Sequence, residues 1–187
     1  MRHTEPPAAF GFRWFVVTKR STQKMNSPHK EKMIAFVSEL ACEFPHLRFE
    51  MDAGHKDVDF YSEFPIQENL SFTIGVALDY DLLSLYVGAL WLEYFPVTDV
   101  SVLESFSTAL RGLLLGTYRV VEYASGNSSP HKAVLQYREN GHWQACGRSS
   151  RFHLPSFRPT HERVLIRVEP CDTSNPLTPL AQGADGR

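Results

Sequence analysis

The chain has 187 residues, of which 43% are hydrophobic and 12% aromatic, and these values predict one globular domain whose core needs no disulfide or metal. Its three cysteines, Cys42, Cys146 and Cys171, are too few for a disulfide framework, so we expect reduced thiols and a cytoplasmic protein. The net charge of −2 and the pI of about 6.4 argue against a dedicated nucleic-acid-binding protein.

The first expected elements are a strand and a helix, preceded by a disordered segment over residues 1–9. Residues 10–18 alternate large apolar side chains with others and predict a strand. A helix is expected to begin at Ser27, which can cap it, with Pro28 in the first helical position. The helix should end at Pro45, and its apolar residues recur every three or four positions: Met33, Phe36, Val37, Leu40 and Phe44.

The next segment predicts antiparallel strands joined by short turns. Residues 47–51 and 58–64 are expected to be strands, with a turn at 52–55 between them. From Leu70 to Tyr80 every second residue is apolar. This alternation predicts a strand over about residues 69–79 with one face in a core.

A second long strand is expected to follow a turn at Tyr80–Asp81. It should run from Leu82 to Phe95, with Gly88 as a β-bulge. The apolar run inside it, residues 82–92, is shorter than the roughly 20 residues that a membrane span needs. We therefore expect no membrane span in this chain.

A second helix and a second group of strands complete the expected domain. Thr98 or Asp99 starts the helix, a capping box of Ser101 and Glu104 is the alternative start, and Gly116 ends it. The helix should bury Leu103, Phe106, Leu110 and Leu113. Further strands are expected at residues 118–123, 132–138, 142–146 and 163–169, with a type I′ turn at Asn140–Gly141.

These elements define the expected fold class. Because short turns join most strands and only two helices interrupt them, we expect an α+β fold of mainly antiparallel β-sheet, with two amphipathic helices packed on one face. Residues 10–169 should form a single α+β domain. Residues 170–187 are rich in Pro, Ser, Thr, Gly and Asp and should form a disordered tail.

Charge is distributed unevenly along the chain. Residues 1–38 carry +5, residues 39–104 carry −11, residues 105–169 carry +5, and the remaining residues carry −1. Two interpretations stay open. Either the segments neutralise one another across the folded surface, or the acidic segment forms a face that steers a basic partner toward it.

The second interpretation predicts a non-enzymatic, soluble protein-binding module whose partner has a basic surface. Its candidate partner-binding residues lie close together in the sequence, and we expect them to be exposed: Glu50, Asp52, Asp57, Asp59 and Glu63. Small soluble bacterial immunity proteins, which neutralise basic toxins by covering them, have this general character, although the chain carries no motif of any such family.

The alternative is a small enzyme or ligand-binding domain with an aromatic pocket. Glu93 lies in an aromatic setting between Trp91 and Tyr94, and Glu122 lies on a later strand. If both strands belong to one sheet, the two carboxylates could face each other as a general acid–base pair does. A pocket lined by these four residues would favour the alternative.

No motif in the sequence indicates a catalytic, cofactor or metal site. There is no Gly-rich phosphate loop, no nucleophile elbow and no pair of metal-binding cysteines, so we assign no catalytic residue, cofactor or metal. The turn that holds Asp52, His55, Asp57 and Asp59 is interpreted as solvated rather than as a cation site. We interpret Cys146 as a small buried thiol.

A basic set near the end of the chain is the last feature with two interpretations. Arginines interleaved with Phe152 and Phe157 could bind phosphates and stack bases, or they could form a surface loop that pairs with the acidic middle of the chain. The set consists of Arg148, Arg151, His153, Arg158, His161, Arg163 and Arg167.

Overall fold

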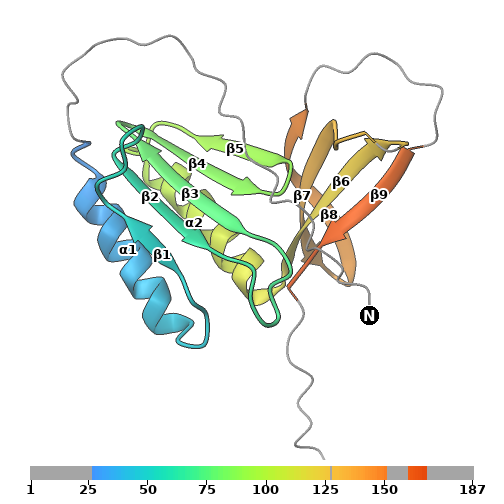
Figure 1. Cartoon of the computed structure of the whole chain (residues 1–187), viewed down its shortest axis with the longest axis horizontal. Coiled ribbons are helices and arrows are strands. Elements are labelled where there is room, and N and C mark those ends of the chain that lie inside the picture. The colour runs from blue at the N-terminus through green and yellow to red at the C-terminus, as the bar shows by residue number, and fades with distance from the viewer. Residues whose placement is uncertain (1–26, 127, 151–159, 168–187) are drawn as a thin grey trace, which may run out of the picture.

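The computed structural model describes residues 27–126, 128–150 and 160–167. These ranges contain two helices, α1 (Lys30–Glu43) and α2 (Val100–Leu115). They also contain nine strands (Figure 1): β1 (Glu50–Asp52), β2 (Phe60–Phe64), β3 (Ile74–Asp79), β4 (Leu82–Val87), β5 (Leu90–Tyr94), β6 (Tyr118–Ser125), β7 (Lys132–Glu139), β8 (His142–Ser150) and β9 (Thr160–Leu165). The strand expected at residues 10–18 and the two ends expected to be disordered lie outside the described residues.

The strands form two antiparallel sheets. The five-stranded sheet has the order β1-β2-β3-β4-β5, and the four-stranded sheet has the order β8-β7-β6-β9. The four-stranded sheet stands beside the β5 edge of the first, where β5 contacts β8 (Figure 1). Residues of both sheets and both helices contribute to one buried apolar cluster. The predicted α+β class with mainly antiparallel sheet is therefore confirmed, whereas the division into two sheets was not foreseen.

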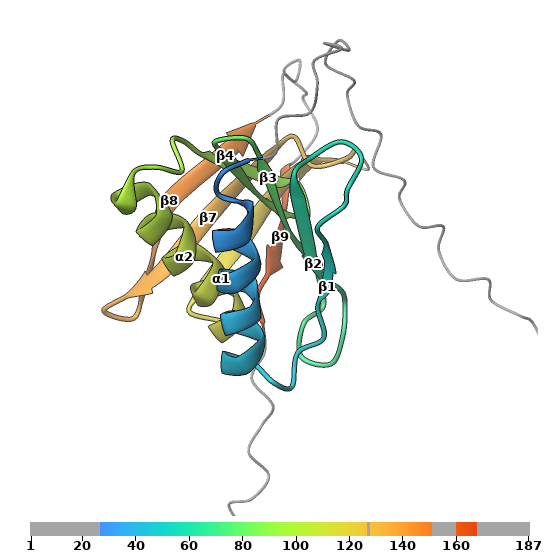
Figure 2. The same ribbon diagram turned by 90° about the vertical axis from the view of Figure 1, so that its left-hand side faces the viewer.

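Both helices lie on the same side of the five-stranded sheet (Figure 2). α1 turns Met33, Val37 and Leu40 into the core, as their spacing predicts. α2 begins after Asp99, whose carboxylate caps the first turn, and ends at Gly116 in the left-handed conformation with φ of 76°. No described helix covers the opposite side of this sheet, which faces the viewer in Figure 1.

The expected long strand from Leu82 to Phe95 is wrong, because the chain reverses direction at Gly88 and Ala89 to give β4 and β5. Gly88 has φ of +57°, a conformation that residues with side chains rarely adopt. The Ala89 N–H donates a hydrogen bond to Glu122 Oε1 on β6 at 2.5 Å. The turn is therefore fixed by a side chain of the other sheet, which no local sequence pattern reveals.

The start of the first helix also differs from the expectation. α1 begins at Lys30 rather than Ser27, because the Ser27 hydroxyl does not cap the helix. Instead it donates to the Tyr80 carbonyl and accepts a hydrogen bond from the His29 N–H at 3.1 Å. Ser27 thus ties the entry to α1 onto the β3–β4 turn.

Two predicted turns are confirmed. Asp79 pairs with Leu82, so the β3–β4 turn lies where the sequence predicts it. Asn140 and Gly141, with φ of 49° and 81°, join β7 to β8 as a type I′ turn requires.

Neither described helix is long and apolar enough to cross a membrane.

Candidate functional site

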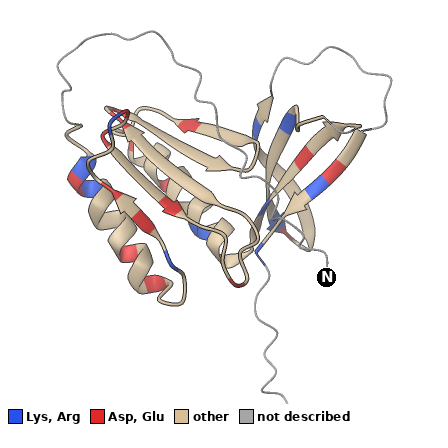
Figure 3. Ribbon diagram, viewed as in Figure 1, with Lys and Arg blue, Asp and Glu red and all other residues tan. Residues whose placement is uncertain are grey.

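The helix-free side of the five-stranded sheet is acidic. Because side chains alternate along a strand, the pairing register gives this side, here called the outer face, a fixed set of residues: Glu50, Asp52, Tyr61, Glu63, Gly75, Ala77, Asp79, Leu82, Ser84, Tyr86, Trp91 and Glu93. These include all five acidic residues of β1 to β5, and the five strands contain no Lys, Arg or His. Figure 3 marks the acidic positions of this sheet in red.

Four of these five carboxylates form no ion pair with a Lys or Arg of the described residues. No ion pair within the described ranges joins Glu50, Asp52, Glu63 or Glu93 to a Lys or Arg. Glu50 lies directly opposite Glu63 in the β1–β2 pair. Like charges in that position destabilise a sheet because they repel each other, so this pair does not serve the stability of the fold.

Aromatic rings accompany the carboxylates across the outer face. The Tyr61 hydroxyl donates to Glu63 Oε2 at 2.6 Å and lies against Gly75, where an added Cβ would be 3.2 Å from it and 3.5 Å from Tyr86 Cβ. Tyr86 stacks on Trp91 with ring centroids 6.0 Å apart. Ring faces and carboxylates both attract cations, and the planar guanidinium of arginine suits both.

Burial and the nearby carboxylates raise the pKa values of the tyrosines on the outer face. Burial, then the hydrogen bond to Glu63, raises the pKa of the Tyr61 hydroxyl. Burial raises the pKa of Tyr86 as well, and the charges of Glu93 and Asp79 add to the effect. A negative neighbour disfavours the phenolate, because ionisation would create a second negative charge beside it.

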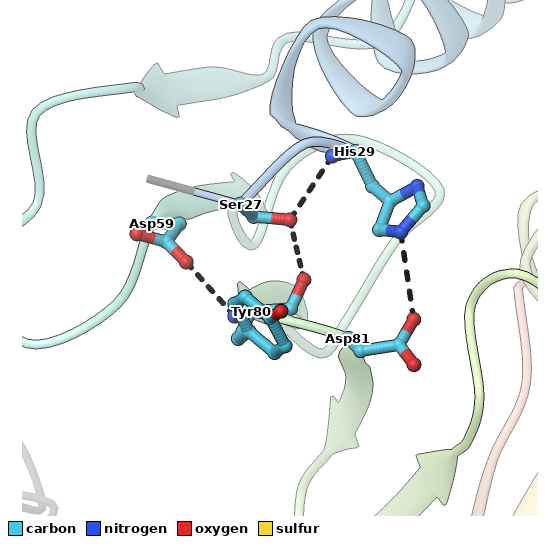
Figure 4. Close-up of polar contacts among 5 residues, drawn as sticks. All are labelled: Ser27, His29, Asp59, Tyr80 and Asp81. Carbon is cyan, nitrogen blue, oxygen red and sulfur yellow. Dashed lines mark hydrogen bonds and ion pairs between the residues drawn. The ribbon is translucent and has the colours of Figure 1, made fainter. Parts of the chain in front are cut away.

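The structure brings three of the five predicted partner-binding residues onto this face. Glu50, Asp52 and Glu63 belong to the outer face, while Asp57 is exposed in the loop between β1 and β2. The expectation that Asp59 is exposed is wrong, because this residue is buried, with only 3% of its surface accessible to solvent. Its carboxylate accepts a hydrogen bond from the Tyr80 N–H at 2.8 Å (Figure 4) and so holds the β3–β4 turn.

Two acidic residues of the outer face were missing from the predicted partner-binding set. The alternation from Leu70 to Tyr80 places Asp79 in phase with Gly75 on the polar side, so the sequence carried that signal. For Glu93, its aromatic neighbours in the sequence predict a place in a pocket instead. Only the β4–β5 register, in which Glu93 pairs with Ser84, places its side chain on the outer face.

A serine, a histidine and an aspartate meet at the start of α1 (Figure 4), and these residue types form hydrolase triads elsewhere. Here the Ser27 hydroxyl donates to the Tyr80 carbonyl and accepts from the backbone of His29, not from its ring. His29 Nε2 lies 3.5 Å from Asp81 Oδ1. The cluster therefore anchors α1 to the β3–β4 turn and does not activate a nucleophile.

The four residues of the predicted pocket have separate surroundings. Trp91 and Glu93 line a cleft between β5 and the four-stranded sheet, whereas Tyr94 lines a second cavity beside α2. Glu122 lines neither and is 1% exposed. Its carboxylate accepts from the β4–β5 turn and from Arg163 Nε at 2.7 Å. The two glutamates thus have different partners, and neither described cavity is lined by all four residues.

The second cavity, of about 490 Å³, contains a thiol and two phenols but no activated nucleophile. Cys146 is exposed there, so the expectation of a buried thiol is wrong. Partial burial of the thiol group nevertheless raises its pKa, which disfavours the reactive thiolate. Burial also raises the pKa of Tyr94 to about 12, so its hydroxyl stays neutral in ordinary solution.

The described residues form no metal site, and two members of the basic set have structural partners. No three His, Cys, Asp or Glu side chains gather in a metal-binding arrangement within the described ranges. Residues 151–159 of the basic set lie outside those ranges. Of its other members, Arg163 pairs with Glu122 and Arg167 donates to the Leu114 carbonyl.

Comparisons with known proteins supply no relative. No protein-family model, no curated protein and no solved structure matches this chain.

Proposed function

We propose that the chain is a protein-binding module whose outer face covers the basic surface of a partner protein. The observation that carries this proposal is the charge of the five-stranded sheet: its five acidic strand residues share the helix-free face, and its strands contain no basic residue. Complementary charge speeds association and selects the partner.

The ion pairs of the described residues favour this interpretation over internal neutralisation. Arg111 pairs with Glu39 at 3.6 Å and with Glu43 at 2.9 Å, and both glutamates lie on α1, away from the outer face. The carboxylate of Glu122 forms an ion pair with the exposed Arg163. The basic flank of the chain therefore meets the acidic middle on the helices, while the outer face keeps its charge.

The centre of the outer face suits a protein partner better than a small molecule. Its centre consists of the small residues Gly75, Ala77 and Ser84, with tyrosine rings and carboxylates around them. Neither described cavity lies at that centre. Aromatic anchors surrounded by charged groups are typical of protein interfaces, in which arginine is a frequent partner residue.

The first test uses a synthetic peptide that alternates arginine and glycine as a basic probe, followed by amide NMR of the full chain. We expect shift changes over β1 to β5 that disappear at raised salt, since salt screens exposed charges. The double variant Glu50→Gln, Glu63→Gln should weaken binding roughly fivefold, because each exposed ion pair contributes little.

The matched control is the double variant Glu31→Gln, Glu162→Gln, which removes the same charge from exposed positions on α1 and β9. We expect it to bind the probe like the original protein. Equal losses in both double variants would show attraction to net charge alone and would contradict the proposal. A partner captured from the source cells counts only if the outer-face variant, and not the control, loses it.

A further inference from the structure

The cleft between the two sheets differs in chemistry from the outer face. It has a volume of about 580 Å³ and is lined by Ala89, Trp91, Leu92, Glu93, Pro130, His131, Lys132, Arg148, Ser149 and Ser150. One wall comes from β5, and the other comes from β7, β8 and the residues just before β7. Its volume falls in the range of small-molecule sites, roughly 300–1,000 Å³.

One of the lining side chains of the cleft joins the two sheets. The Ser149 hydroxyl on β8 accepts a hydrogen bond from the Trp91 N–H at 3.2 Å and donates to the Ala89 carbonyl at 3.3 Å. Ser149 thereby fixes the distance between β5 and β8. Walls held by hydrogen bonds of the protein itself need little ordering when a ligand binds, which lowers the entropic cost of binding.

The β5 wall provides an aromatic platform. Trp91 is 54% exposed, although it stacks on Tyr86. An indole that is held by a neighbouring ring and still half-exposed can stack a planar ring, and stacking of a nucleobase on an aromatic side chain stabilises binding. Glu93, on the same wall, can accept hydrogen bonds from amino or hydroxyl groups of a ligand.

The opposite wall provides two cations. Lys132 Nζ lies 4.7 Å from the centre of the Tyr123 ring, and Arg148 is exposed. No ion pair within the described ranges joins either side chain to a carboxylate. Two such cations at one cleft favour an anionic group, and arginine binds a phosphate or carboxylate through two parallel hydrogen bonds.

We propose that this cleft binds a small ligand that carries a planar ring and an anionic group, of the mononucleotide class. The ring stacks on Trp91, the anionic group lies between Lys132 and Arg148, and Glu93 accepts from the polar edge of the ring or from a hydroxyl. This site shares Trp91 and Glu93 with the outer face. Its cations belong to the four-stranded sheet, so variants of those cations distinguish it from the proposed protein-binding function.

Calorimetric titration of the full chain with adenosine monophosphate tests the proposal, with adenosine and inorganic phosphate as partial probes. We expect saturable one-to-one binding of the monophosphate and much weaker binding of either part alone. Adenosine binding as tightly as the monophosphate would overturn the role of the cations. Phosphate binding as tightly would overturn the role of Trp91, and no saturable binding at millimolar concentration would overturn the site.

Variants locate the binding to the cleft. Arg148→Gln should weaken binding roughly tenfold, as loss of a charge-assisted hydrogen bond does, and Trp91→Ala should weaken it by a similar factor through lost stacking. Arg138→Gln is the matched control, since Arg138 is exposed on β7 but does not line the cleft. Equal weakening by the control would contradict the site.

The same variants separate this proposal from the protein-binding one. Glu50→Gln with Glu63→Gln should leave the affinity for the monophosphate unchanged, because both residues lie on β1 and β2, away from the cleft. Arg148→Gln should not weaken binding of the arginine–glycine probe to the outer face. Each proposal can therefore fail while the other stands.

Discussion

Both sheets of this protein consist of antiparallel strand pairs, but the strands of one sheet are acidic and those of the other are mainly basic. The strands of the five-stranded sheet contain five acidic and no basic residues. The strands of the four-stranded sheet contain three acidic residues and five Lys or Arg: Arg119, Lys132, Arg138, Arg148 and Arg163.

Two of the five basic side chains of the four-stranded sheet are held by their own neighbours. Arg119 lies over the Trp143 ring at 4.2 Å and donates to Gln136, while Arg163 pairs with Glu122. The outer face has no comparable pairing of Glu50 or Glu63 with a cation. The difference shows that charge segregated along a chain can stay segregated in space.

The largest expected effect concerns the contact that joins the two sheets. Glu122→Ala leaves the half-buried Ala89 N–H without its acceptor and opens a cavity, so we expect a loss of about 3 kcal/mol in the free energy of unfolding. Urea unfolding followed by circular dichroism measures this loss. Glu162→Ala, an exposed change on the neighbouring strand β9, should have little effect.

The same variant tests whether residues 10–169 form one domain, which stays a prediction. If the two sheets unfold together, hydrogen exchange in Glu122→Ala should accelerate equally in β3 and in β7. Acceleration confined to the four-stranded sheet would show two independent units and would contradict the single domain.

A smaller loss is expected at the residue that sequence reasoning misplaced. Asp59→Ala removes the acceptor of the Tyr80 N–H in a turn where Tyr80 has φ of 54°, and should cost about 2 kcal/mol of stability. Thermal unfolding measures it. The variant should bind the basic probe unchanged, whereas weakened binding would return Asp59 to the partner-binding set.

Local signals in the sequence predict much of the fold, and contacts between distant segments explain what they miss. Asp99, Gly116 and the Asn140–Gly141 turn are readable because caps and tight turns depend on a few adjacent residues. The Gly88 turn is not readable, since it is fixed by Glu122, 33 residues from Ala89. The burial of Asp59 is not readable for the same reason, because its partner Tyr80 is 21 residues away.

The same difference between local sequence patterns and contacts of distant segments applies to the candidate site. The sequence identifies the acidic segment, and the period of two places Glu50, Asp52 and Glu63 on one side of their strands. It does not identify the cleft, because Trp91 and Arg148 meet only when β5 lies beside β8. Contact between two separate sheets produces no periodic pattern in the sequence of either segment.

High pH provides a third way to compare the regions, with a smaller effect on stability because the hydroxyls are partly solvated. The folded protein raises the pKa of Tyr61, Tyr86 and Tyr94, while unfolded tyrosine ionises near 10. The raised values stabilise the neutral forms, so this contribution is complete below about pH 10 and is lost as pH rises through the folded pKa values. The melting temperature should therefore fall above about pH 10.

Ultraviolet titration separates the two regions in that experiment. Glu63→Gln should lower the pKa of Tyr61, because the charge of Glu63 contributes to its shift. The pKa of Tyr94, which depends on burial and on Cys146 and Tyr118, should stay at about 12. Equal movement of both would mean that Glu63 acts through the whole fold rather than on its own face.

The smallest expected effect decides whether the outer face is shaped by binding or by folding. Glu50→Gln removes the like-charge pair with Glu63 and should raise the free energy of unfolding by roughly 0.5 kcal/mol, less at high salt. The same variant should weaken binding of the basic probe. A residue that costs stability and contributes affinity serves the partner. If Glu50→Gln instead destabilises the protein, the carboxylate supports the sheet itself, and the charge of this face needs no partner to explain it.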